Sequence, residues 1–181
     1  KLRAGVQIAD VSEDYQTLAL WNNARSLEQA HATHSFADPR HRDLGVRILA
    51  KKTGMEEIVR SIAGTVVEAN AYDALRIAIG VPQIGSDYGS ADVTPHEANF
   101  DLLNGVSFTK GCYVGQEVVA RMQNKTVVRK RVARISGAGL LISGTDILLG
   151  NAAIGRVGTV DDKQALALLR LDRAIEALET S

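Results

Sequence analysis

Cysteine is nearly absent from this sequence of 181 residues, in which Cys112 is the only one. A single thiol excludes an intramolecular disulfide framework and any metal site built from several thiolates, and it fits a reducing compartment. Long apolar runs are missing too, since no stretch approaches the ~18 consecutive apolar residues of a membrane span. These absences predict a chain that does not enter a membrane, and we expect a cytoplasmic location.

The net charge is zero as well, because the chain has 21 basic and 21 acidic side chains, but these charges are unevenly distributed along it. Acidic residues exceed basic ones by four in residues 1–117, and basic residues exceed acidic ones by four in residues 118–181. This asymmetry predicts two modules with different surfaces. Neither an initiator Met nor a secretory signal opens the chain, so we expect a fragment or a trimmed form.

With 45% hydrophobic and 23% charged residues, the chain has the composition of a folded globular protein. Apolar residues alternate around Val6 and Ile8 and again around Leu18 and Leu20, which predicts two strands joined at Ser12–Asp14. Further expected elements are a surface loop over 22–43, a strand over 46–49, helices over 53–64 and 65–80, a capped short helix over 94–103, a strand over 106–108 and a helix over 116–122.

From residue 126 onward the sequence changes to short runs of β-forming residues separated by Gly and Asp. Strands are expected over 127–135, 140–142, 147–149, 154–160 and 166–171, followed by a short helix that Asp172 caps. Several short strands at this spacing predict a small barrel or sandwich. We therefore divide the chain into an α+β region over residues 1–125 and a C-terminal domain, a small barrel or sandwich, over residues 126–181.

Cys112 is the first candidate for chemistry. Lys110 precedes it, and a helix beginning at Gln116 would place exposed N–H groups near the sulfur; both features favour the nucleophilic thiolate. The alternative is that Cys112 is a small buried hydrophobic residue. No His lies in the same turn, so a Cys–His pair would need His96 or a loop His brought close by the fold.

Other motifs are weaker. The Gly-Lys-Ser/Thr sequence of a Walker motif and the Gly-x-Gly-x-x-Gly fingerprint of dinucleotide sites are both absent, which disfavours nucleotide binding. His31-x-x-His34 fits a solvated loop better than half a metal site. The basic run from Arg121 to Arg134 fits either a solvated strand face or a phosphate- or nucleic-acid-binding surface.

The segment Lys110-Gly111-Cys112-Tyr113-Val114-Gly115-Gln116-Glu117 resembles the signature of the folate-binding YgfZ family, relatives of the glycine cleavage T-protein, an aminomethyltransferase. The resemblance extends along the chain. Further segments similar to the family are Arg76-Ile77, Gly80–Pro82, Pro95–Ala98, Asn104–Phe108, Val118–Arg121 and Leu166–Leu171.

Membership would imply an α+β fold in which a ring of subdomains, partial here because its N-terminal part is missing, binds tetrahydrofolate and is followed by a β-barrel. It would also imply a role in iron–sulfur cluster assembly or repair, with effects on tRNA-modifying enzymes and with iron–sulfur client or assembly proteins as partners. No metal ligand is assigned. On this resemblance the catalytic candidates are Cys112 and Lys110, and the cofactor-binding candidates are Gly111, Tyr113, Gly115, Gln116, Glu117, Arg121 and Arg76.

Two alternatives stay open at this point. One is folate-dependent aminomethyl transfer, but the T-proteins carry a folate-facing Glu where this chain has Ala78, which cannot accept a hydrogen bond from a pterin. The other is direct tRNA contact through the basic run from Arg121 to Arg134, for which binding should weaken steeply with salt.

Overall fold

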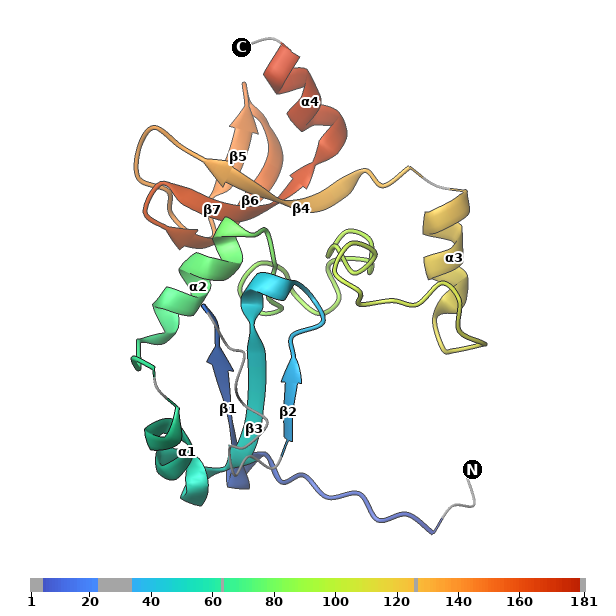
Figure 1. The fold of residues 1–181 in the computed structure, drawn as a ribbon. Coiled ribbons are helices and arrows are strands. Elements are labelled where there is room, and N and C mark those ends of the chain that lie inside the picture. The colour runs from blue at the N-terminus through green and yellow to red at the C-terminus, as the bar shows by residue number, and fades with distance from the viewer. Residues whose placement is uncertain (1–4, 23–33, 63, 126, 180–181) are drawn as a thin grey trace. The chain divides into compact units, whose positions relative to one another are not determined.

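The structure is a computed structural model that describes residues 5–22, 34–62, 64–125 and 127–179 (Figure 1). The chain forms two compact units, the first made of the residues up to 38 and of 42–67, the second of 39–41 and the residues from 68 onward. The sequence predicts a boundary after residue 125 instead. The units divide earlier because helix α2 (Ala69–Ala78) packs on the C-terminal sheet.

The first unit is a three-stranded antiparallel sheet covered by a helix. Strand β3 (Val46–Lys51) lies in the centre, with β1 (Tyr15–Leu20) and β2 (His34–Ala37) at the edges. Helix α1 (Met55–Ser61) packs on one face of this sheet, where Ile48, Ala50, Met55 and Ile58 form the core. Short 3-10 turns occupy Ser12–Asp14, Arg42–Leu44 and Lys52–Gly54.

The strand around 46–49 and the helix after residue 53 are confirmed in this unit. The strand expected around Val6 and Ile8 is wrong, because residues 5–11 form no strand and both side chains are exposed. Part of the expected loop, His34–Ala37, is strand β2. All four of its side chains are exposed, so its backbone pairing with β3 leaves no pattern of buried residues in the sequence. His31 lies outside the described residues.

The second unit is built on a four-stranded antiparallel sheet in the order β4-β7-β6-β5. Its strands are β4 (Lys130–Ser136), β5 (Asp146–Leu149), β6 (Ala152–Asp161) and β7 (Gln164–Arg170). Helix α2 lies on this sheet (Figure 1), and Ile77 packs in one cluster with Val132 and Leu166. Helix α3 (Gln116–Asn124) precedes the sheet and α4 (Leu171–Glu179) follows it.

Helices α2 and α3 and four of the five strands expected after residue 126 are confirmed; residues 140–142 form no strand. The helix over 94–103 is wrong, because this segment is a series of turns in which Asn99 has a φ of 63°. Residues 106–108 form no strand either. Helix α4 begins at Leu171, so Asp172 lies in its first turn rather than at its cap. None of the helices in the described parts of the chain has the length and hydrophobicity to cross a membrane.

Candidate functional site

The motif around Cys112 forms a loop that ends where α3 begins. The backbone N–H of Lys110 donates to the Ser107 hydroxyl at 3.3 Å, and that of Tyr113 donates to the side-chain oxygen of Gln116 at 3.1 Å. Gln116 is the first residue of α3, so its side chain ties the loop to the helix. The loop is therefore held at both ends of the segment that carries the thiol.

The two glycines of the motif have different roles. Gly115 is the N-cap of α3 and has a φ of 85°, a left-handed conformation that costs a residue with a Cβ about 1 kcal/mol or more. Gly111 does not have a positive φ, and a Cβ there would meet no atom within 4 Å. The turn into the helix therefore requires glycine only at Gly115.

Cys112 is exposed, as is its neighbour Val114. The ammonium nitrogen of Lys110 lies 4.6 Å from the centroid of the Tyr113 ring, so a cation–π interaction positions this charge. Within the described residues, no group of three or more His, Cys, Asp or Glu side chains could hold a metal ion. The exposed thiol can therefore supply one ligand or one nucleophile, but these residues do not build a metal site around it.

A pocket of about 570 Å³ lies between this loop and one face of α3. Loop residues form one wall, and helix residues spaced three, four and seven apart form the other. Its lining consists of Ser107, Phe108, Lys110, Tyr113, Gln116, Glu117, Val119, Ala120, Gln123 and Asn124. The lining as a whole thus combines two aromatic rings, a cation, a carboxylate and several amide or hydroxyl groups.

The structure brings some of the predicted site residues together. Lys110, Tyr113, Gln116 and Glu117 line the pocket. The predicted residues Gly111, Cys112, Gly115 and Arg121 are exposed neighbours that do not line it. Arg76 lies elsewhere, on α2. The catalytic and cofactor-binding roles of all these residues stay predictions.

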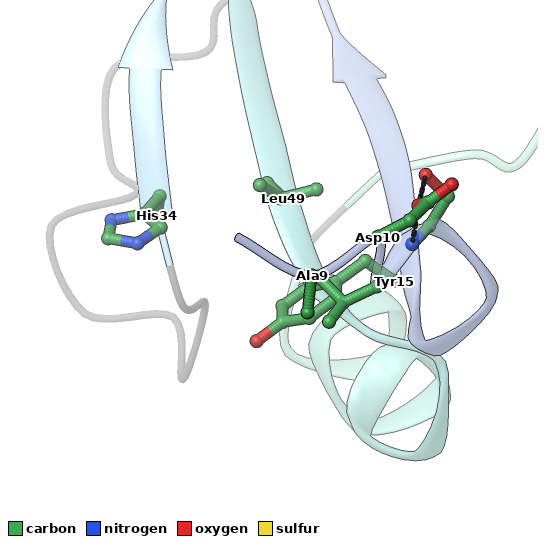
Figure 2. A pocket seen from close by; sticks show the side chains of 7 residues that line it. Ala9, Asp10, Tyr15, His34 and Leu49 are labelled. Carbon is green, nitrogen blue, oxygen red and sulfur yellow. Dashed lines mark hydrogen bonds between the residues drawn. The ribbon is translucent and has the colours of Figure 1, made fainter. Parts of the chain in front are cut away.

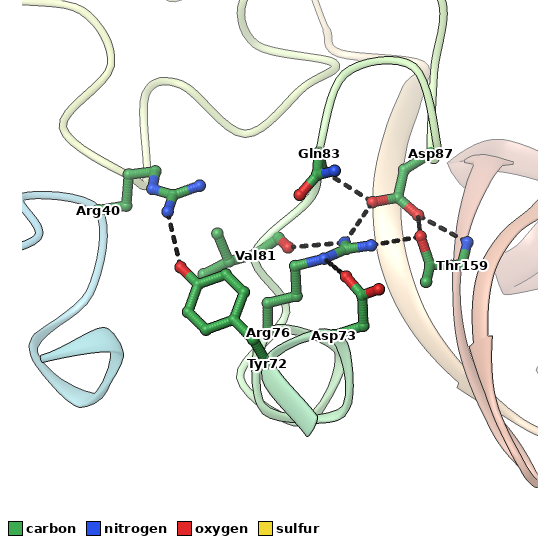
Figure 3. Close-up of polar contacts among 8 residues, drawn as sticks. All are labelled: Arg40, Tyr72, Asp73, Arg76, Val81, Gln83, Asp87 and Thr159. Atoms are coloured by element: carbon green, nitrogen blue, oxygen red, sulfur yellow. Dashed lines mark hydrogen bonds and ion pairs between the residues drawn. The ribbon is translucent and has the colours of Figure 1, made fainter. Parts of the chain in front are cut away.

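Arg76 is only 1% exposed and lies in a polar cluster (Figure 3). Its guanidinium donates to Asp73 at 2.6 Å, to Asp87 at 2.6 Å, to the carbonyl oxygen of Val81 and to the Thr159 hydroxyl. This cluster joins α2, the loop after it and strand β6. Arg76 thus has an architectural role, and its assignment to cofactor binding rests on the family resemblance alone.

A bulge in β6 makes this cluster possible. The register with β7 shifts between Val157 and Val160, where Gly158 lies so close to Asp87 that a Cβ would clash. The Thr159 amide and hydroxyl can then both donate to Asp87, each at 2.7 Å. Burial raises the pKa of the adjacent Tyr88, and the negative charge of Asp87 adds to this shift.

Two members of the basic run bind groups of the protein itself. Arg131 makes a bidentate ion pair with Asp101, at 2.8 and 2.9 Å, and Arg134 donates to the carbonyl oxygen of Ala78. Burial alone would raise the pKa of Asp101, but the hydrogen bonds and charge of Arg131 outweigh it, so this pKa is lowered. The run is therefore partly structural.

A second pocket, of about 420 Å³, lies in the first unit (Figure 2). It is lined by residues of the segment before β1 and of all three strands: Ala9, Asp10, Val11, Ser12, Tyr15, His34 and Leu49. The Asp10 carboxylate accepts hydrogen bonds from the Ser12 amide and hydroxyl, which lowers the pKa of Asp10. None of the predicted site residues lies in this pocket.

Sequence reasoning missed the pairing of His96 with Gln123. His96 is 1% exposed, and its Nε2 lies 3.1 Å from the side-chain oxygen of Gln123, which lines the pocket. Pro95–Ala98 was visible as a motif, but no local signal connects it with a residue 27 positions later. From the sequence, the only chemical role expected for His96 is that of a possible base for Cys112.

The C-terminal sheet corresponds to a known domain family. Residues 129–180 match the family model described as the CAF17 C-terminal beta-barrel domain. The chain thus carries a CAF17-type barrel domain. This agrees with the small C-terminal barrel predicted from the strand spacing, whereas the ring of subdomains expected before it stays a prediction.

Similarity to curated proteins extends over most of the chain. It is 35% identical over 136 residues to the iron-sulfur cluster assembly factor IBA57 homolog of Mycosarcoma maydis, covering 75% of this chain and 33% of that protein. Identity to the Dictyostelium discoideum homolog is 32%, covering 73% and 35%, and to human IBA57 31%, covering 73% and 38%. The chain with its CAF17-type barrel therefore spans about a third of the length of these relatives.

The cytoplasmic location predicted from the sequence is contradicted by these relatives. The fungal, amoebal, mouse and human proteins are all named as mitochondrial. A lone cysteine indicated a reducing compartment, but it does not distinguish one such compartment from another.

Proposed function

We propose that this chain is part of an iron–sulfur cluster assembly factor that acts through Cys112. The observation that carries this proposal is the exposed thiol on a fixed loop beside a polar and aromatic pocket. The similarity to proteins named as iron–sulfur cluster assembly factors supports the same class of function.

The thiol acts together with a partner. Clusters usually take about four protein ligands, and Cys112 supplies one. As a thiolate it is a ligand for iron, and its exposure leaves it accessible to a client or assembly protein that contributes the others. Cys112 therefore has a transient or shared role rather than that of a permanent cluster site.

Tetrahydrofolate is the cofactor that we propose for the pocket. This molecule combines a reduced pterin, whose flat pyrimidine half offers hydrogen-bond donors and acceptors at its edge, with a glutamate tail that carries carboxylates. The lining residues fit such a ligand: Phe108 and Tyr113 offer ring surfaces, Lys110 offers a cation for a carboxylate, and Glu117 accepts from ring N–H groups. When bound, tetrahydrofolate would supply a one-carbon acceptor or carrier.

Effects on tRNA-modifying enzymes follow from the same proposal if these enzymes are clients that need clusters. Direct contact with tRNA has less support, because Arg131 and Arg134 are engaged by Asp101 and by the carbonyl oxygen of Ala78. Aminomethyl transfer is the competing activity, and turnover of the purified protein with tetrahydrofolate in the absence of iron–sulfur proteins would favour it.

The test replaces Cys112 by Ser in the full-length protein, in cells that lack the native gene, and measures the activities of iron–sulfur enzymes. We expect these activities to stay at the level of the deletion, because a hydroxyl is a poor ligand for iron. The matched control is Val114→Ala, a change at another exposed side chain two residues away, which should restore them.

Measurements on the purified Cys112→Ser protein distinguish a chemical role of the thiol from an effect on folding or on folate affinity. Its unfolding free energy should change by less than about 0.5 kcal/mol, since the side chain is exposed. Tetrahydrofolate should bind it as it binds the wild type, because Cys112 does not line the pocket. Full rescue of the cells by Cys112→Ser would refute the proposed role of the thiol.

A further inference from the structure

One residue on the face of α3 that lines the pocket, Gln123, is contacted by a buried histidine. Gln123 lies seven residues after Gln116 and lines the same pocket. Its side-chain oxygen lies 3.1 Å from Nε2 of His96. A carboxamide oxygen only accepts hydrogen bonds, so Nε2 carries the hydrogen and donates it.

His96 is well placed to hold this orientation. It is buried, its Nδ1 has no hydrogen-bond partner among the described residues, and its ring packs 6.1 Å from the ring of Phe108, another pocket residue. The contact with Gln123 is therefore the hydrogen bond that the structure gives this imidazole. His96 is not one of the lining residues, but it contacts two of them, Gln123 and Phe108.

The segment that carries His96 is anchored on the barrel. The carbonyl oxygen of Glu97 accepts from the Val132 N–H at 2.9 Å, and the Asn99 side chain donates to the Val132 carbonyl oxygen at 2.9 Å. Arg131, the neighbour of Val132 on β4, adds its ion pair with Asp101. A fixed backbone thus supports the imidazole, which fixes the carboxamide of Gln123 in turn.

Once the oxygen of Gln123 accepts from His96, its nitrogen is the end of the carboxamide left to donate. We propose that Gln123, oriented by His96, is a specificity-determining residue that donates to a carbonyl or carboxylate oxygen of the ligand in this pocket. Lys110 supplies the positive charge on the opposite, loop-formed wall. The pocket therefore favours ligands that carry oxygen acceptors. This inference rests on the proposed function, because it takes tetrahydrofolate as the ligand.

The test measures tetrahydrofolate affinity by titration of the full-length protein under anaerobic, reducing conditions. Gln123→Ala should weaken binding about fivefold to tenfold, the loss of one hydrogen bond. Gln123→Glu should weaken it more, because the carboxylate still accepts from His96 but offers the ligand a negative charge and no donor.

Asn124 supplies the matched control. It also lines the pocket, but its carboxamide nitrogen already donates to the Ala120 carbonyl oxygen of its own helix, at 3.1 Å. Asn124→Ala should therefore lose less affinity than Gln123→Ala, because its carboxamide nitrogen is already engaged. Asn124→Asp introduces the same charge as Gln123→Glu at the adjacent position, so a larger loss in Gln123→Glu measures the donor rather than the charge.

His96→Phe tests the positioning step. It should weaken binding about as much as Gln123→Ala, and it should have no further effect when combined with Gln123→Ala, whereas independent structural damage would add. If His96→Phe does not fold, the Gln123 and Asn124 variants still test whether Gln123 donates to the ligand. Unchanged affinity in Gln123→Glu would overturn this inference and leave folate binding standing, whereas no binding by the wild type would overturn both.

Discussion

Arg76 and Lys110 are both basic residues of the second unit, but their surroundings are opposite. The guanidinium of Arg76 is buried and binds two aspartates, a carbonyl oxygen and a hydroxyl, while the ammonium of Lys110 lies on the Tyr113 ring at the edge of an open pocket. The sequence analysis makes Lys110 a catalytic candidate and Arg76 a cofactor-binding candidate, and the structure places them in different surroundings. The comparison shows that one basic side chain is bound into the fold by four protein partners, whereas the other lies on an aromatic ring among the residues that line a pocket.

The strongest way to break this comparison is to remove Asp87. Asp87→Ala removes the buried one of the two carboxylates that bind the Arg76 guanidinium, and it leaves the amides of Gln83 and Thr159 without their acceptor. We expect a loss of about 3–5 kcal/mol in the free energy of unfolding, measured by urea titration and circular dichroism. Asp73→Ala is the control, because Asp73 binds the same guanidinium from a side chain 38% exposed and should cost about 1 kcal/mol or less. Similar losses in both variants would contradict the architectural role.

A smaller effect is expected at Asp101, which anchors the turn segment to β4 through its paired hydrogen bonds with Arg131. Asp101→Asn should cost about 2 kcal/mol at pH 7. The pKa of Asp101 is lowered in the folded state, so the ion pair stabilises the fold above the unfolded-state pKa of about 4.

This stabilisation is lost as the pH falls through the folded-state pKa of Asp101. Urea titrations at several pH values should therefore show the wild type and Asp101→Asn converging below about pH 4. A difference that persists unchanged at pH 3 would mean that packing, rather than the charge, is responsible.

The smallest effect sharpens the comparison within the loop itself. Gly115→Ala should destabilise the second unit by about 1 kcal/mol, because its φ of 85° disfavours a Cβ even though no atom lies within 4 Å. Gly111→Ala has the same open surroundings without the positive φ, so its unfolding midpoint should stay that of the wild type. Equal shifts would show that the two glycines have the same role.

The elements that could be predicted are those with a local signal. Helix α3 follows Gly115 and has an apolar face, and the strands after residue 126 are short β-forming runs between turn residues. The exposed strand β2 could not be found in this way, because its edge position is defined by backbone pairing with β3 rather than by buried side chains. Asn99 interrupts the expected helix: its φ is 63°, and its side chain donates to a carbonyl oxygen 33 residues later in the chain.

For the candidate site, too, only the features with a local signal could be predicted from the sequence. The motif located the loop and four of the residues that line the pocket, since they are neighbours in sequence. The partners of Arg76 could not be predicted, because Asp87 and Thr159 lie 11 and 83 residues away and nothing local connects them. His96 and Gln123 were missed for that reason too. A site made of residues adjacent in the chain can be predicted from one sequence. Contacts between side chains far apart in the chain depend on the fold and cannot.

The packing of Ile77 also bears on whether the barrel domain can be transferred from one protein to another. The family match begins at residue 129, but the cluster of Val132 and Leu166 is completed by Ile77, and Thr159 on β6 bonds to Arg76 of the same helix. Excised at the family boundary, the barrel would present an apolar surface and unpaired polar groups to water. A functional graft of this domain into another protein must therefore bring α2 along or find an equivalent helix there.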